Sequence, residues 1–334
     1  HWLGERRTIL LFLGLCGGGL IVIGSGAGLL ESYPVALAGF AVFGFATGLC
    51  DVGMNVTGAG AERAAGRTIM PWFHACWSVG TASGAGVGAA AAFAGVPVAV
   101  HLIVIGVLVM TGAAVVVRWI PSNAHVDEDG APARVGFRGR MAVWLDPRTL
   151  LIGLLVLGMA FAEGSANDWI AIGFIDGRGL DNGQGALMFG VFSVAMTAGR
   201  ILGVPLLDRF GRVPVLRGAA ISAAVGLALV ILVPVIPIAV AGVVLWGLGA
   251  SLGFPVGMSA AADDPRTAAA GVSAVATIGY AAFLIGPPLI GFVGEQIGVL
   301  NALWIVLVPI LAGSIGILAA REPRREDAVL AERT

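Results

Sequence analysis

Residues 199–218 read GRILGVPLLDRFGRVPVLRG, and this stretch joins two long apolar runs. It places one aspartate, Asp208, and several arginines around a short turn at Gly211. Glycine permits a tight turn, and the Asp208 carboxylate can accept hydrogen bonds from a helix start or an arginine. Such a charged cluster can hold neighbouring helix ends together in one state and release them in another. The simpler interpretation is a positively charged loop between two helices.

The apolar runs on either side belong to a series that covers most of the chain. Hydrophobic residues make up 58% of the sequence and charged residues 12%, whereas a soluble domain carries about 25% charged residues. A transmembrane helix needs about 20 mostly apolar residues, and the runs lack the alternation of an outer-membrane barrel. The sequence therefore predicts an all-α membrane protein. Ten stretches qualify as spans: 8–29, 35–58, 72–93, 98–118, 149–173, 186–206, 213–233, 237–259, 268–292 and 299–320.

The positive charges are distributed unevenly among the gaps between spans. All 19 basic residues of the chain are arginines. They fall at the two ends and in every second gap, and Arg178 is the single exception. Because loops rich in arginine stay in the cytoplasm, the pattern predicts that these gaps and both chain ends are cytoplasmic.

One gap is much longer than the others and divides the spans into four and six. It is polar and contains the run Asp127-Glu128-Asp129, as expected of a linker between two bundles. The predicted organisation is a partial N-terminal helical bundle at 1–118, a cytoplasmic linker at 119–148, a C-terminal six-helix bundle at 149–320 and a cytoplasmic tail at 321–334.

The turn at 199–218 resembles the loop signature of the major facilitator superfamily, a glycine followed by Asp-Arg, one residue and Gly-Arg. Gly203, Asp208, Arg209, Gly211 and Arg212 match it. Gly203 lies one residue further from Asp208 than the family's glycine does. The resemblance implies a two-bundle transporter that works by alternating access.

The opening residues HWLGERRTIL resemble the tail of the same loop in the first half of the family fold. Gly4, Arg6 and Arg7 are kept, whereas His1 stands in place of the aspartate and Trp2 in place of the arginine. On this resemblance, the chain contains family helices 3–12, its first span is family helix 3, and the first two helices are missing.

Two further stretches, 48–89 and 279–295, resemble the fucose-permease-like branch and related bacterial inner-membrane carriers. That resemblance implies a bacterial plasma (inner) membrane location and transport of sugars or other small solutes, commonly with protons. We expect a monomer in the lipid bilayer whose partners are a small-molecule substrate and protons, with no nucleic acid, no metal and no cofactor.

Two carboxylates lie inside predicted spans, where a charge costs about 2.5–3.5 kcal/mol and normally faces a bundle interior or a cavity. Asp51 is followed one turn later by Asn55, and Glu163 by Asn167. Residues four apart share a helix face, and Thr47 lies on the same face as Asp51 and Asn55. The resemblance assigns these spans to family helices 4 and 7, which with helices 1 and 10 line the central cavity.

These acids suggest a coupling site. The hypothesis is that Asp51 or Glu163 takes and releases a proton while Asn55 and Asn167 hydrogen-bond a polar substrate. The alternative is that each acid is structurally paired or reaches a lipid or water boundary.

Three other polar residues are possible accessories. His74 lies near the cytoplasmic end of its span, where an interfacial or packing role is the simpler interpretation. Asp168 and Trp169 lie nearer the outer end and are typical of an interfacial belt. Arg200 is expected to support the charged loop, with a substrate contact as the alternative.

Small residues predict close helix contacts. Gly80, Gly84 and Gly88 recur every four residues in one span, and Gly242 and Gly249 lie in another, with Gly247 and Gly253 nearby. Phe254-Pro255 and Pro287-Pro288 mark possible helix breaks, although a proline kink with satisfied neighbours is the simpler interpretation of both.

Taken together, the sequence predicts a secondary transporter for a small polar solute, sugar-like or another metabolite, coupled to protons. Proton-driven drug or metabolite efflux is the alternative if the cavity is mostly apolar. A membrane-embedded enzyme is a distant alternative, because Asp263-Asp264, beside Arg266, is the only adjacent aspartate pair and no second motif supports it. The sequence contains no nucleotide-binding loop, and we expect no enzymatic activity.

Overall fold

The structure, a computed structural model, describes residues 4–119 and 141–322. Every regular element in these two ranges is a helix. Packing divides the chain into a first unit of 1–57 with 79–134 and a second unit of 58–78 with 135–334. Most of the expected linker and tail, together with His1 and Trp2, lie outside the described residues.

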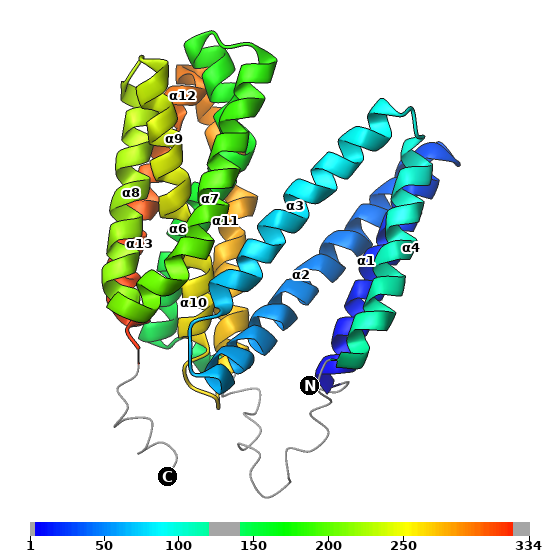
Figure 1. The fold of residues 1–334 in the computed structure, drawn as a ribbon, viewed down its shortest axis with the longest axis horizontal. Coiled ribbons are helices and arrows are strands. Elements are labelled where there is room, and N and C mark those ends of the chain that lie inside the picture. Colours follow the sequence, from blue (N-terminus) through cyan, green and yellow to red (C-terminus); the bar gives the residue numbers. More distant parts are fainter. Residues whose placement is uncertain (1–3, 120–140, 323–334) are drawn as a thin grey trace, which may run out of the picture. The chain divides into compact units, whose positions relative to one another are not determined.

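The first unit is built from helices that follow one another along the chain (Figure 1). These are α1 (Gly4–Gly28), α2 (Tyr33–Ala65), α3 (Met70–Phe93), α4 (Val98–Val116) and the 3-10 turn η1 (Val117–Trp119), of which α2 and α3 also run into the second unit. Glycines bring α1 close to its neighbours. A Cβ at Gly17 would lie 2.5 Å from the Gly106 carbonyl oxygen of α4, and one at Gly26 would lie 2.5 Å from the Ala36 nitrogen of α2.

The expected close packing of Gly80, Gly84 and Gly88 was wrong within the described part of the chain. A Cβ at Gly80 or Gly84 would have no described atom within 4 Å, and one at Gly88 would meet only the His101 Nε2 atom at 3.9 Å. The spacing puts the three glycines on one face of α3, but packing also requires a second helix against that face.

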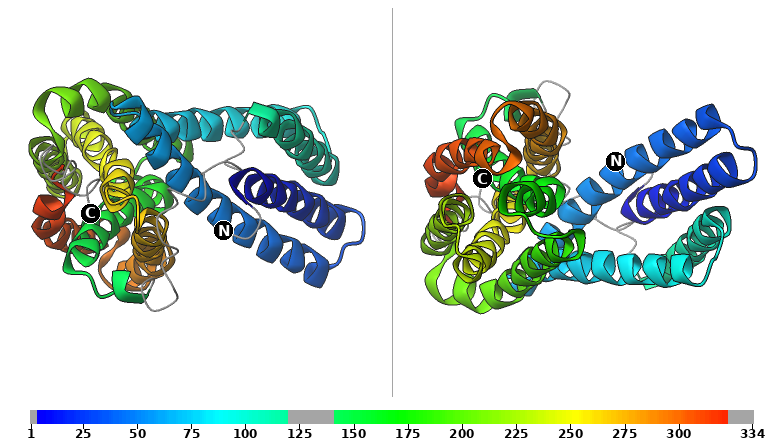
Figure 2. Two further views of the ribbon diagram at one scale, coloured as in Figure 1. Left: turned by 90° about the horizontal axis from the view of Figure 1, so that it is seen from below. Right: turned by 90° about the horizontal axis from the view of Figure 1, so that it is seen from above.

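The second unit is a helical bundle, seen end-on in Figure 2. After the ends of α2 and α3, its elements are α6 (Pro147–Arg178), α7 (Asn182–Phe210), α8 (Arg212–Leu232), α9 (Ile236–Ala250), α10 (Gly253–Ala261), α11 (Ala268–Ile297), α12 (Val299–Ala302), α13 (Trp304–Ile315) and the 3-10 turn η2 (Gly316–Ala320). Helix α6 packs against α7, α10, α11 and α13 and is the most enclosed of the long apolar helices described.

Local signals fix where α6 begins and ends. The Asp146 carboxylate accepts hydrogen bonds from the backbone nitrogen and the hydroxyl of Thr149, both at 2.8 Å, and Pro147 occupies the first turn. Burial raises the pKa of Asp146, but the bonds from Thr149 outweigh burial and hold that pKa below its ordinary value. Gly179, at φ 69° and ψ 25°, ends the helix in the left-handed conformation that glycine adopts most easily.

The glycines of α9 and α10 pack as expected. A Cβ at Gly242 would lie 2.8 Å from the Gly226 carbonyl oxygen of α8, and one at Gly249 would collide with the Ala223 backbone. Gly247 approaches Phe192 of α7, and Gly253 of α10 approaches Met159 of α6. Adding a methyl group at these positions would force the helices apart.

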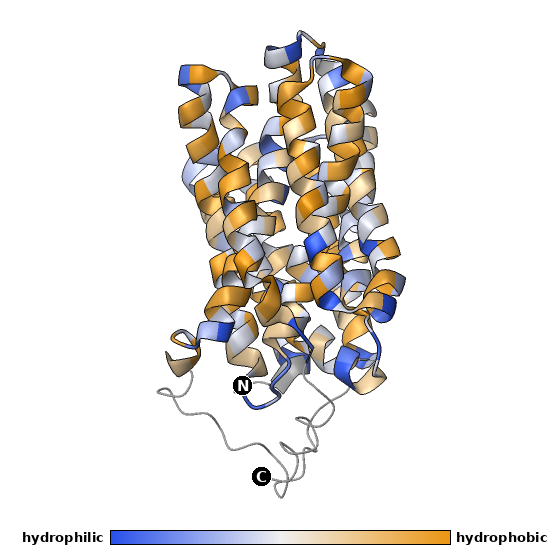
Figure 3. Ribbon diagram, turned by 90° about the vertical axis from the view of Figure 1, so that its left-hand side faces the viewer, coloured by the Kyte–Doolittle hydropathy of each residue, from blue (hydrophilic) through white to orange (hydrophobic). Residues whose placement is uncertain are grey.

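Nine helical segments among the described residues are long and apolar enough to cross a membrane. Eight of them are Arg6–Gly28, Tyr33–Ala65, Val98–Trp119, Pro147–Arg178, Gly183–Phe210, Arg212–Leu232, Ala268–Ile297 and Val299–Ala320, and the ninth, Ile236–Ala261, combines α9 and α10. The remaining expected span, 72–93, is the helix α3. Figure 3 shows hydrophobic residues along the lengths of the helices and hydrophilic residues gathered near their ends.

The two proline pairs behave differently. The helix stops at Ser251 and Leu252, so the break near Phe254-Pro255 is confirmed. At Pro287-Pro288 the simpler interpretation holds and the possible break does not occur, because both prolines lie inside the continuous helix α11. The indole Nε1 of Trp169 donates to the Pro287 carbonyl oxygen at 3.1 Å, which joins α6 to α11 at this point.

Arg178, the exception to the arginine pattern, has a structural role. It is the last residue of α6, and its Nη2 atom donates to the carbonyl oxygens of Val230 and Ile231 at 2.8 and 2.9 Å. These carbonyls belong to the final turn of α8, where carbonyl groups have no hydrogen-bond partners within their own helix. A cation at a helix C-terminus also interacts favourably with the helix dipole.

We therefore expect Arg178→Ala to destabilise the second unit. Loss of two charge-assisted hydrogen bonds should lower the free energy of unfolding by about 1–2 kcal/mol, measured by thermal unfolding of the protein in detergent. The exposed Arg217 of α8 provides the matched control. Equal melting temperatures for R178A and R217A would contradict this role for Arg178.

Candidate functional site

The second unit contains an ion pair between two of its long helices. Glu163 lies midway along α6, and Arg200 lies in α7. The Nη2 atom of Arg200 is 3.1 Å from Glu163 Oε1 and 3.2 Å from Oε2. The Arg200 side chain is 3% exposed and that of Glu163 is 16% exposed. The arginine is therefore enclosed behind its carboxylate partner.

The other nitrogens of Arg200 bind three more groups. Nη1 donates to the Ser78 hydroxyl in a short contact and to the His74 carbonyl oxygen at 3.3 Å. Nε donates to the Ser251 carbonyl oxygen at 3.4 Å. We call Glu163, Arg200, His74, Ser78 and Ser251 the Arg200 cluster. It joins α3, α6, α7 and the break between α9 and α10.

Two local features make the contact with Ser251 possible. Because α9 ends at Ala250, the Ser251 carbonyl lies where the helix is interrupted. Gly199, the neighbour of Arg200, lets α7 approach this point, since a Cβ there would collide with the Ser251 side chain. The helix break is thus used to bind the guanidinium group.

The surroundings of Glu163 contain few other ionisable groups. The sequences of α9, α10, α12 and α13, which pack on α6, have none. Helix α11 contributes Tyr280 and, near its end, the exposed Glu295. Among the described residues of the second unit, Arg200 is the cation within ion-pair distance of Glu163.

The expected role of Arg200 as support for the charged loop was wrong. Its partners lie in the Arg200 cluster, within the bundle, rather than beside Asp208. The pairing with Glu163 joins residues 37 positions apart on different helices. One signal was present in the sequence, namely an arginine inside an apolar run, which implies a buried partner.

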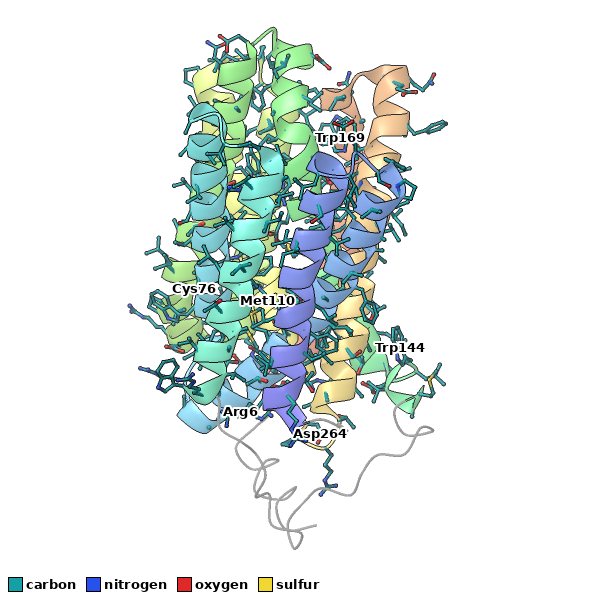
Figure 4. The ribbon with its side chains drawn as sticks, turned by 90° about the vertical axis from the view of Figure 1, so that its right-hand side faces the viewer. Arg6, Cys76, Met110, Trp144, Trp169 and Asp264 are labelled. Atoms are coloured by element: carbon teal, nitrogen blue, oxygen red, sulfur yellow. The ribbon has the colours of Figure 1, made fainter. Side chains whose placement is uncertain are left out.

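The other polar residues of α6 lie further along the helix. Asn167 is one turn beyond Glu163 and is exposed, as is Asp168. Figure 4 shows Trp169 towards one end of the second unit and Asp264 at the opposite end. Asn167 therefore lies on the same side of α6 as Glu163, one turn further along.

His74 is part of the packing as well as of the cluster. Its ring is buried and meets the ring of Phe254 edge-on, with the centroids 5.5 Å apart and an interplanar angle of 60°. Its backbone carbonyl, rather than its imidazole, accepts from Arg200. These contacts fit the packing interpretation of this residue.

The acid of the first unit forms a separate arrangement on α2. The amide nitrogen of Asn55 donates to the Asp51 carboxylate at 3.1 Å and to the Asp51 carbonyl at 2.9 Å. Asn55 is fully buried. One turn earlier, Thr47 lies 3.5 Å from the Cys16 sulfur of α1. The Asn55 side chain therefore orients Asp51.

The charged loop contains the expected tight turn. Gly211, at φ +76°, is the only residue between α7 and α8. Asp208 accepts from the Thr68 backbone nitrogen at 3.3 Å, near the start of α3. A Cβ at Gly203 would lie 2.5 Å from Leu252, and the Arg209 guanidinium lies 5.2 Å from the Phe210 ring centroid.

The sequence did not reveal the centre of the charge network at this end. Asp263 lies in the turn after α10 and accepts from Arg212 at 3.0 Å and from Arg148 at 2.5 Å. Beside it, the Ala262 carbonyl accepts from Arg63 at 2.5 Å. Three arginines from α2, α6 and α8 thus hold one turn. Both Asp263 oxygens are engaged, which disfavours the enzyme interpretation of Asp263-Asp264.

A second unexpected group caps α3. The Glu62 carboxylate accepts from the backbone nitrogens of Ile69 and Met70 at 2.8 and 2.7 Å. These are orphan donors at a helix start, where an anion is favourable. The cap fixes the turn between α2 and α3 and therefore the direction in which α3 approaches Arg200.

Known proteins identify the family. The profile described as Major Facilitator Superfamily matches residues 165–334. The "Uncharacterized transporter y4wD" of Sinorhizobium fredii is 33% identical over 296 residues, which are 85% of this chain and 76% of that protein. The chain belongs to the major facilitator superfamily. An uncharacterized MFS-type transporter of Yersinia pestis is also 33% identical, over 80% of this chain and 67% of that protein. The membrane protein MosC of Rhizobium meliloti is 27% identical, over 85% of this chain and 66% of that protein.

Solved structures of the superfamily share the fold. The transporter FucP in its outward conformation matches with a TM-score of 0.76 at 16% identity, over 95% of this chain and 83% of that one. The human organic anion transporter MFSD10 matches with a TM-score of 0.74 at 17% identity, over 94% of this chain and 77% of that one. The family and the all-α membrane fold predicted from the sequence are therefore confirmed. The chain is a multi-pass secondary transporter of small molecules.

Proposed function

We propose that this transporter moves a small polar solute together with protons by alternating access. The observation that carries the proposal is the Glu163–Arg200 pair, a carboxylate and a guanidinium enclosed between apolar helices. Charges in such a place are costly and usually mark a substrate or proton pathway. A pair used only to hold helices together could be replaced by apolar packing at little cost.

The proposed orientation places the charged loop and Asp263 in the cytoplasm, in a bacterial inner membrane. The support is the arginine distribution, together with the role found for its exception. Arg178 caps the C-terminus of α8 by donating to its last carbonyls. This capping role explains why one arginine lies on the opposite side of the membrane from the others.

In the proposed cycle, Glu163 takes up a proton when the cavity opens on one side and releases it on the other. Protonation removes the charge that faces Arg200, and the hold of α7 on α6 weakens. Asn167, exposed one turn away, contacts the solute. Asp51, oriented by Asn55, is a second carboxyl that takes part in proton exchange.

Similar structures illustrate two kinds of transport. One is described as a fucose:proton symporter and another as an organic anion transporter. The first description supports proton coupling on this fold. Because identities to both are below 20%, the substrate has to be argued from this chain's own residues.

The test is solute-driven proton movement in proteoliposomes that contain a trapped pH-sensitive dye. Sugars and sugar acids are supplied singly, and proton movement is recorded for the wild type, E163Q and D51N. We expect both variants to lose solute-driven proton movement while E163Q still exchanges labelled solute across the membrane, because glutamine cannot carry the proton. E295Q, altered at an exposed carboxylate of α11, is the matched control.

Wild-type proton coupling in E163Q would remove Glu163 from the proposal, and the same result in D51N would remove Asp51. Coupling retained in both variants would contradict the proposed proton sites altogether.

A further inference from the structure

The Arg200 cluster also indicates what kind of solute the transporter takes. We propose that, once Glu163 is protonated, Arg200 binds the carboxylate of an anionic solute in its place. The substrate class is then a small organic acid, such as a sugar acid, rather than a neutral sugar. This inference rests on the proposed proton uptake by Glu163.

The positive charge of Arg200 is permanent. A guanidinium group keeps its proton at every physiological pH, and Arg200 is 2% exposed. Its partners besides Glu163 are the neutral oxygens of Ser78, His74 and Ser251. When Glu163 becomes neutral, a buried cation is left without a counter-charge, which is strongly unfavourable.

The elements around Arg200 offer no other acid to replace Glu163. Helices α9, α10, α12 and α13 contain no acidic residue. The acid of α11, Glu295, lies near the end of that helix, and residues 70–78 of α3 bring only His74 and Cys76 as titratable groups. On α6 the other acids, Asp168 and Asp176, lie beyond Glu163 towards the end of the helix, and on α7 the nearest acid along the chain is Asp208, which accepts from Thr68. Within the described residues of the second unit, the missing anion has to be supplied by the solute.

The guanidinium group of Arg200 is already positioned to receive a solute carboxylate. Nε and Nη1 are held by Ser251, His74 and Ser78, so only Nη2 points to Glu163. A carboxylate can place its two oxygens on Nη2 as Glu163 does, and charge-assisted bonds of this kind are the strong ones. Glu163 is also the more exposed partner, so a solute that displaces it does not have to move Arg200.

The exchange keeps the charge of the site balanced. One proton bound to Glu163 removes one negative charge, and one solute carboxylate restores it. Proton and monoanion therefore cross together with no net charge. A neutral sugar would leave Arg200 unpaired in the same step.

Formate is the probe for this site, because it is a carboxylate small enough to fill the space left by a shortened side chain. In Glu163→Ala, we expect formate to raise the melting temperature of the purified protein, with an apparent affinity at least about tenfold above that of the wild type at neutral pH. Chloride at equal ionic strength and neutral formamide should give no such increase. E295A is the matched control variant, and E163A/R200Q should lose the response.

Wild-type protein provides an independent arm if E163A does not fold. The formate response should strengthen as the pH falls, because protonation of Glu163 then frees Arg200, and R200Q should show no such trend. A pH-independent wild-type response, or a formate response in E163A that chloride reproduces or that survives R200Q, would overturn the proposal. No formate response in E163A would do the same.

The outcomes separate this inference from the proposed function. A formate response in E163A combined with normal proton coupling in E163Q would leave the anion site standing and remove the proton role. Lost coupling in E163Q without a formate response would keep the proton role and remove the assignment of an acidic solute.

Discussion

Arg200→Gln is expected to lower the free energy of unfolding by about 3 kcal/mol, because it leaves Glu163 in an enclosed site without its cation. The change also removes the donors to Ser251, His74 and Ser78. The contacts between α7 and the first turns of α3 should weaken together with those to α6. Solute transport should fall below detection, since the proposed site loses its cation.

The double variant E163Q/R200Q separates charge from packing. Two neutral amides in the same space have no unpaired charge, so the double variant should be more stable than R200Q alone. A double-mutant cycle of unfolding free energies measures the difference as a coupling energy. Additive effects of the two substitutions would contradict an energetically coupled pair.

Asp263→Asn is expected to have the second largest effect on stability, a loss of about 2 kcal/mol. Two arginines converge on this carboxylate, whose side chain is 9% exposed. Without the negative charge of Asp263, the cations Arg148 and Arg212 face one another across the same turn. The starts of α6 and α8 and the turn before α11 should loosen together, which lowers the melting temperature in detergent.

The neighbouring Asp264 supplies the control for this prediction. Asp264 is exposed, and its carboxylate accepts from the Arg266 backbone nitrogen at 2.9 Å within its own turn. D264N should therefore stay within about 0.5 kcal/mol of the wild type, as is usual for surface substitutions. If D263N were no less stable than D264N, the charge network around Asp263 would have no structural importance.

The sequence predicted those features that depend on local composition. Apolar length gave the helices, and the resemblance around Asp208 and Gly211 gave the family. The glycine turn between α7 and α8 was also predictable, because a one-residue connection at φ +76° favours glycine.

Features that depend on distant partners were not predictable in the same way. Arg200 lies only eight residues before Asp208, so proximity along the chain suggested the wrong neighbour for it. Its true partners come from α3, α6 and the α9–α10 break. Glycine spacing on α3 likewise describes one helix face, and nothing in the spacing says whether a second helix covers that face.

Pro287 illustrates a different limit. The proline pair allowed a helix break or a proline inside a continuous helix, and the sequence did not decide between them. Helix α11 continues through the pair, and Trp169 of α6 donates to the Pro287 carbonyl. The neighbouring helix α6 is thus bonded to α11 at the proline pair.

The protonation of Glu163 itself can be measured directly. Infrared difference spectra of the membrane-reconstituted protein, recorded between neutral and acidic pH, report the carbonyl stretch of a neutral carboxylic acid. We predict a band of this kind on acidification that is present in the wild type and in E295Q but missing in E163Q. A band of equal size in E163Q would show that another group takes the proton and would contradict the central role given to Glu163.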